Sequence, residues 1–100
     1  MNETTKGEKM EVLDRFFIAI KKLTEDKLIG GLLSFSTKYG ISRSLMQVKR
    51  KHAGGPELPS SWLLHLVKDY KVNPYWVLLG EGGFYIDGFD LETIKKLQKD

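Results

Sequence analysis

Glycine divides this chain of 100 residues into short segments in which apolar residues recur three or four positions apart. That spacing puts apolar side chains on one face of a helix, and a glycine can end a helix because it tolerates the left-handed backbone conformation. The breaks fall at Gly30-Gly31, Gly40, Gly54-Gly55 and the segment Gly80–Gly83. We therefore expect an all-α fold, a compact bundle of five or six short helices with little or no sheet.

Six segments carry the helical pattern, and several begin with a residue that can cap a helix. Ser42, Asn73 and Asp90 each have a side-chain oxygen that can accept a backbone N–H of the first turn. Ser60 or Ser61 can do the same for the fourth helix. Trp62 and Trp76 lie on apolar faces and are predicted to pack in the core. The segments lie between Met10 and Gly30, over Leu32–Tyr39, over Arg43–Lys51, from the serine pair to Tyr70, from Pro74 to Leu79 and from Leu91 to Leu97.

The length fits one domain with a short tail at each end. Residues 1–9 lack apolar periodicity and are predicted to be disordered, residues 10–84 form the domain, and residues 85–100 form an extension. In the extension, Leu91, Ile94 and Leu97 share one side of a helix. That stripe either folds back on the core or forms a dimer contact, and the pattern leaves both open.

Positive charge is concentrated in the middle third of the chain. The net charge is +3, but no Asp or Glu occurs from Lys27 to Pro56, whereas six Lys and Arg residues, Lys27 included, do. A stretch with such an unbalanced positive field is typical of a surface that binds phosphates. A solvated basic face without a partner is the simpler alternative.

The segment Leu32–Lys51 combines that charge with the pattern of two helices joined by a tight turn. This is the layout of a helix-turn-helix, whose second helix enters the major groove of DNA. Ser36 is small where the two helices approach each other, and Gly40 lies where the turn needs no Cβ. The apolar contacts are expected from Phe35, Tyr39, Ile41, Leu45 and Val48, of which Ile41, Leu45 and Val48 face inward from the turn and the second helix.

The exposed side of that second helix carries residue types that recognise bases. Arg can donate two hydrogen bonds to guanine, Gln can pair with adenine, and Ser suits either role. We therefore expect base contacts from Arg43, Ser44, Gln47 and Arg50. Phosphate contacts are expected from Lys38, Ser42, Lys49, Lys51 and His52.

The segment after the two helices resembles the DNA-binding domain of lambda-like phage repressors. The matching residues are Val72, Asn73, Pro74, Trp76, Val77, Leu78, Gly80, Glu81 and Gly82, and the upstream run Tyr39–Ser42 resembles the turn of that family. The resemblance covers roughly residues 10–84. It implies a lambda-repressor-like fold that binds operator DNA through its third helix, usually as a dimer, in a regulator of transcription.

The chain departs from that family at three places. Ser36 stands where Ala is usual, and Gly31 stands where a Gln often supports DNA contacts. The family also has an apolar residue near Lys49; if Val48 takes that place, the inward and outward sets shift by one residue. These departures keep a second function open, a helical protein-interaction module that retains the fold without binding DNA.

Other function classes find little support in the residues. Cysteine is absent and the two histidines stand alone, so no metal or other cofactor is expected, and no catalytic arrangement or small-molecule substrate is indicated. No apolar run could span a bilayer, and the N-terminus lacks the apolar stretch of a secretory signal. We expect a cytoplasmic, non-enzymatic protein whose partners are double-stranded DNA and, as one alternative, a second copy of the chain.

Overall fold

Six helices make up the regular structure of the residues described by a computed structural model, which are 11–51 and 57–98. They are α1 (Val12–Glu25), α2 (Leu32–Lys38), α3 (Arg43–Lys51), α4 (Ser60–Tyr70), α5 (Pro74–Leu79) and α6 (Leu91–Gln98). Within those ranges no strand forms, and the one β-bridge joins Val72 to Tyr85. The predicted all-α bundle is confirmed. The tail predicted over residues 1–9 lies outside the described residues.

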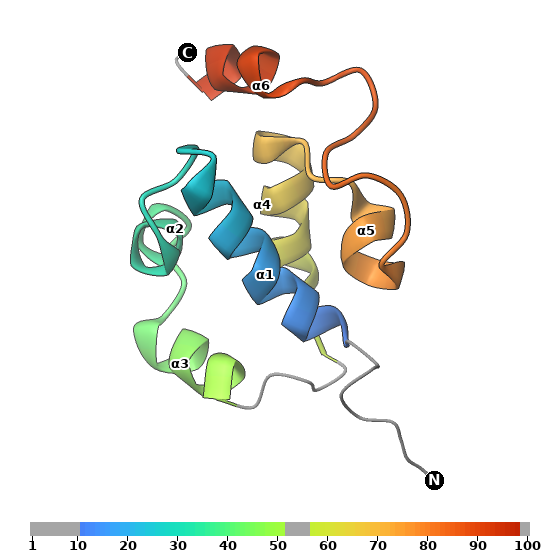
Figure 1. Ribbon diagram of the computed structural model, residues 1–100. Helices are drawn as coiled ribbons and strands as arrows, with labels where there is room; N and C mark the ends of the chain where they lie inside the picture. The colour runs from blue at the N-terminus through green and yellow to red at the C-terminus, as the bar shows by residue number, and fades with distance from the viewer. Residues whose placement is uncertain (1–10, 52–56, 99–100) are drawn as a thin grey trace, which may run out of the picture.

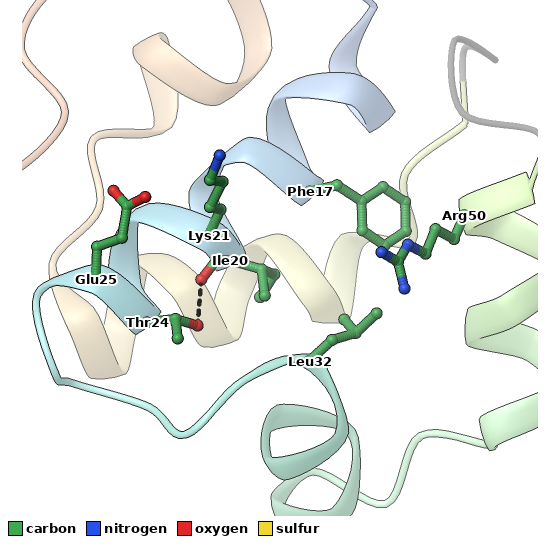
Figure 2. A pocket seen from close by; sticks show the side chains of 7 residues that line it. All are labelled: Phe17, Ile20, Lys21, Thr24, Glu25, Leu32 and Arg50. Carbon is green, nitrogen blue, oxygen red and sulfur yellow. Dashed lines mark hydrogen bonds between the residues drawn. The ribbon is translucent and has the colours of Figure 1, made fainter.

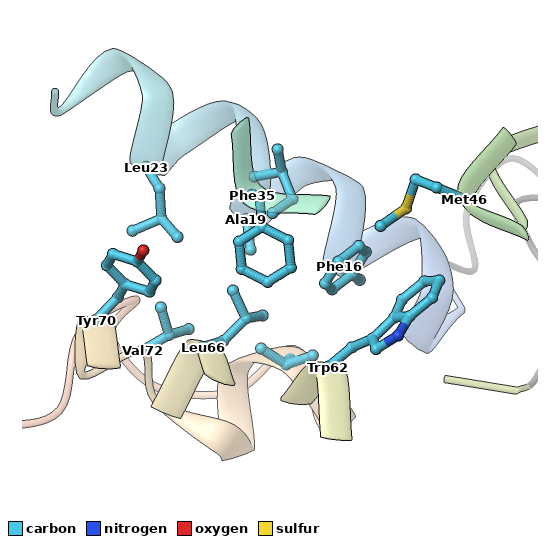
Figure 3. Close-up of a cluster of buried hydrophobic side chains, with 11 residues drawn as sticks. Phe16, Ala19, Leu23, Phe35, Met46, Trp62, Leu66, Tyr70 and Val72 are labelled. Atoms are coloured by element: carbon cyan, nitrogen blue, oxygen red, sulfur yellow. The ribbon is translucent and has the colours of Figure 1, made fainter. Parts of the chain in front are cut away.

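Helix α1 lies in the middle of the fold, with α2 and α3 on one side and α4 and α5 on the other (Figure 1). Its apolar stripe supplies Phe16, Ala19 and Leu23, all of which are fully buried. Figure 3 shows these side chains between residues of α4 and the side chains of Phe35 and Met46. The expected inward position of Trp62 is confirmed, with 3% of the residue exposed, and Trp76 packs partly buried against the core. The core therefore forms around one face of α1.

The helix ends follow the local rules that the sequence predicts, with one exception. Asn73 accepts a hydrogen bond from the backbone N–H of Tyr75 at 3.0 Å, and Asp90 accepts one from Thr93 at 2.8 Å. The prediction of a serine cap on α4 is wrong, because Pro59 holds the cap position and Ser60 is already helical. The fixed φ of Pro59 leads the chain into the helix without a side-chain cap.

Helix α5 is fastened to α1 through its carboxyl end. The Arg15 guanidinium donates from Nε to the carbonyl of Val77 at 2.7 Å and from one terminal nitrogen to that of Leu78 at 2.8 Å. The last carbonyls of a helix have no partner within the helix and carry a partial negative charge, so a cation there is stabilising. Helix α5 is thus tied to α1 by a charged side chain.

Helix α6 folds back on the domain. Ile94 is fully buried. The side-chain amide of Gln98 donates a 2.5 Å hydrogen bond to the carbonyl of Asp69, near the end of α4. Between α5 and α6, the Tyr85 hydroxyl donates to Asp26 at 2.7 Å. Of the apolar stripe in this extension, Leu97 stays 45% exposed. None of the described helices is long and apolar enough to cross a membrane.

Candidate nucleic-acid interface

A four-residue turn sets the direction in which α3 leaves α2. Gly40 has a φ of +66°, and the N–H groups of Gly40 and Ile41 donate to the carbonyls of Thr37 and Ser36 at 3.3 and 2.9 Å. These two bonds and the left-handed conformation of Gly40 form a Schellman motif, which ends α2. Ser42 then begins α3, because its hydroxyl accepts the N–H of Leu45 at 3.2 Å. The predicted roles of Gly40 in the turn and of Ser42 as the cap of α3 are confirmed.

Tyr39 and Lys38, at the end of α2, bind this turn to α4. The Tyr39 ring stacks on His65 with centroids 3.8 Å apart, and its hydroxyl donates to Asp69 at 2.5 Å. The Lys38 ammonium lies 3.3 Å from the Tyr70 hydroxyl and close to the Tyr39 and Tyr70 rings. These contacts hold the carboxyl end of α2 against α4.

The predicted inward face of α3 is wrong. Leu45 and Val48 are 43% and 53% exposed, whereas Met46 is 2% exposed and Ile41 is half-buried. Figure 3 shows the Met46 side chain pointing toward Phe16 and Trp62. The unbranched, flexible Met side chain adapts to the surface of these two rings more easily than the stiffer Leu or Val could. The inward position of α3 is thus Met46, one residue after the predicted Leu45, and the outward set shifts with it. Val48 does not take the inward place near Lys49.

The shift leaves four exposed residues as neighbours on α3: Ser44, Gln47, Val48 and Lys51, here called the outer face. Each is three or four positions from another, so their side chains adjoin on the helix surface. The predicted base-contact residues Ser44 and Gln47 belong to it. Val48 was predicted to face inward and instead lies on this surface. Met46 alone marks the inward side of α3, and a single apolar residue in a sequence is too little to predict which side of a helix faces the core.

Arg43 and Arg50 lie on the flank of α3 that faces α2. Both line a small hollow of about 140 Å³ with Leu32, Ser36 and Met46 among its other walls. Arg50 also borders a larger hollow of about 430 Å³ against α1. Figure 2 shows its guanidinium beside the Phe17 ring, while Lys21 and Glu25 point away from it. Arg43, at the start of α3, and Arg50, near its end, are therefore both at the edge of the outer face.

The predicted phosphate-contact residues are dispersed around the outer face. Lys51 belongs to it, whereas the half-buried Lys49 has its ammonium 3.9 Å from a carboxylate oxygen of Glu57. Lys38 lies beside the aromatic rings of Tyr39 and Tyr70, and the Ser42 hydroxyl is engaged as the helix cap. His52 lies outside the described residues. The structure thus brings one predicted phosphate ligand, Lys51, directly next to predicted base ligands.

Tyr39→Phe should destabilise the fold at neutral pH and make its stability less sensitive to alkaline pH than that of the wild type. Burial raises the pKa of the Tyr39 phenol, and the bond to Asp69 raises it further because the protonated form donates it. A folded-state pKa above the unfolded value of about 10 stabilises the fold below that pH, and this contribution disappears as pH rises through the folded-state pKa. Removing the hydroxyl should cost about 1 kcal/mol at neutral pH.

Urea denaturation of both proteins across pH 7–11 measures this difference. The cost of Tyr39→Phe should be constant up to about pH 10 and begin to shrink above it, where the phenol ionises in the unfolded protein but not in the folded one. Tyr75→Phe is the control, because the Tyr75 ring is 65% exposed and should leave stability unchanged. Equal stabilities of Tyr39→Phe and wild type at pH 7 would show that the Tyr39–Asp69 bond contributes nothing.

No protein-family model, curated protein or solved structure matches the chain. The resemblance to phage repressors stays a prediction made from the sequence.

Proposed function

We propose that the chain binds double-stranded DNA as a transcriptional regulator, with α2 and α3 acting as a helix-turn-helix and α3 entering the major groove. The observation that carries this proposal is the outer face of α3, where Ser44, Gln47 and Lys51 are exposed on one surface. No acidic residue occurs from Leu28 to Lys51, so nothing on α2 or α3 repels a phosphate backbone. The Schellman turn supports the proposal by holding α3 at a defined angle to α2.

Contacts to DNA divide by the place of each side chain on α3. Arg43, Ser44 and Gln47 lie in its first half and supply the base contacts, with two hydrogen bonds possible from Arg to guanine or from Gln to adenine. Arg50 adds a base contact from the flank. Lys51 adjoins the outer face and binds phosphate, and the other phosphate ligands are Lys38, Ser42, Lys49 and His52.

Arg43→Ala and Gln47→Ala should each relax the preference for one base pair. A bidentate contact discriminates against the wrong base by about 1–3 kcal/mol, so each variant should lose that much at one position of the site and little elsewhere. The measurement begins with selection of preferred duplexes from a random pool. Fluorescence anisotropy then compares the variants on that duplex and on its single base-pair changes.

Two lysine variants serve as controls for this experiment. Lys51→Ala should weaken all duplexes alike, because a phosphate contact carries no base information. Lys95→Ala removes the same charge from the exposed side of α6 and should change little. If Arg43→Ala and Gln47→Ala kept the full wild-type preference at every position, the assignment of base contacts to α3 would be wrong.

A helical protein-interaction module is the second candidate, and the outer side of α5 favours it. Tyr75, Leu78 and Leu79 are 65%, 42% and 58% exposed at positions that adjoin on a helix. Contiguous apolar groups on a surface are typical of contacts between proteins. Duplex binding at low salt separates the candidates, because the interaction module does not require it.

A further inference from the structure

Val48 is an exposed apolar side chain on the outer face of α3. It is 53% exposed, its neighbours three or four positions away on α3 are Ser44, Lys51 and the exposed Leu45, and it lines a shallow hollow with Gln47 and Lys51. The core does not need it, since Met46 occupies the inward position of α3 (Figure 3). A β-branched residue in a helix has one preferred χ1 rotamer, so the two methyl groups of Val48 are held in a fixed direction.

The major groove of DNA offers such a side chain one apolar partner. Each base pair there presents hydrogen-bond donors and acceptors, and only thymine adds a methyl group, at C5. Valine can neither donate nor accept a hydrogen bond, so contact with any other base edge would leave polar groups without a partner. The chemistry of Val48 therefore fits a thymine and disfavours the other three bases.

We infer that Val48 contacts the C5-methyl group of a thymine, which makes it a specificity-determining residue of this surface. The inference rests on the proposed function. Gln47, the residue before Val48, pairs best with adenine. The two side chains together select a site in which A·T pairs lie under the middle of α3.

Replacing thymine by uracil removes the methyl group and leaves every hydrogen-bonding group in place. The duplex selected by wild-type protein is prepared with each thymine replaced singly by deoxyuridine, and anisotropy gives the affinity of each. The wild type should bind one of these duplexes about fourfold more weakly, the factor expected for one buried methyl-sized group. For Val48→Ser, the thymine and uracil duplexes should bind equally at that position.

Leu45→Ser is the matched control, because Leu45 is a similarly exposed apolar residue of α3 outside the outer face. It should keep the fourfold preference for thymine. The inference is overturned if the wild type binds every uracil duplex as tightly as the parent, if the preference survives Val48→Ser, or if Leu45→Ser abolishes it. Wild-type protein that binds no duplex at low salt would overturn the proposed function as well, so the two failures are distinguishable.

Discussion

Phe16→Ala should lower the free energy of unfolding by about 3–5 kcal/mol, the usual cost of removing a buried aromatic ring. Phe16 is fully buried, and its ring joins three helices, with centroid distances of 5.9 Å to Phe35 of α2 and 5.3 Å to Trp62 of α4. The neighbouring rings cannot close the space without losing their own contacts, so a cavity remains. A domain of this size has about 5–15 kcal/mol of stability in total, so the loss is a large fraction of it.

Urea denaturation followed by circular dichroism measures the effect of Phe16→Ala. Leu64→Ala is the control, since Leu64 is 56% exposed on α4 and its truncation should change stability by less than about 0.5 kcal/mol. A loss below about 1 kcal/mol for Phe16→Ala would mean that α1 does not hold the centre of the core. Because Phe16 also lies beneath Met46, the variant should loosen α3 before the other helices.

Raising the salt concentration from 50 to 200 mM should weaken duplex binding about 40-fold. Each phosphate neutralised by a cation releases bound counterions, and the logarithm of affinity falls with the logarithm of salt by about 0.9 per contact. Three lysines are proposed to contact phosphate, namely Lys38, Lys49 and Lys51. Their combined slope is about −2.7. Anisotropy titrations of the selected duplex at four or more salt concentrations, on the order of 50–200 mM, give this slope directly.

Lys51→Ala should reduce the magnitude of that slope by about 1, because it removes one phosphate contact. Lys95→Ala should leave the slope at its wild-type value. Lys49 gives a further comparison, since its ammonium must leave Glu57, 3.9 Å away, to reach a phosphate. The proposal of DNA binding is wrong if the folded protein binds no duplex at 50 mM salt, or if the affinity is independent of salt.

The ends of the helices were predictable from the sequence because each depends on a few adjacent residues. Gly40 provides the left-handed turn, and Ser42, Asn73 and Asp90 cap their helices with bonds to the second or third residue beyond. Such effects act within one turn of the chain and need no tertiary contact. The misplaced cap of α4 shows the limit of this rule, since Pro59 competes locally with the two serines for the same position.

The side of α3 that faces outward was not predictable in this way. Leu45 and Val48 form a better apolar pair by spacing than Met46 does alone, yet Met46 is the residue that packs against Phe16 and Trp62. The choice depends on the shape of a cavity made by residues of α1 and α4, which no local pattern contains. The same reason places Arg50 beside Phe17 and the Lys38 ammonium near Tyr70.

The glycine breaks and capping residues by themselves determined that this chain forms short helices joined by tight turns, because they act on the neighbouring backbone. The acid-free basic stretch likewise follows from the sequence alone. Only the tertiary structure decided which residues of α3 remain on the surface, since burial depends on the volume that distant helices leave open. That packing placed Val48 beside Gln47 on the outer face, and the proposed recognition of DNA depends on this arrangement.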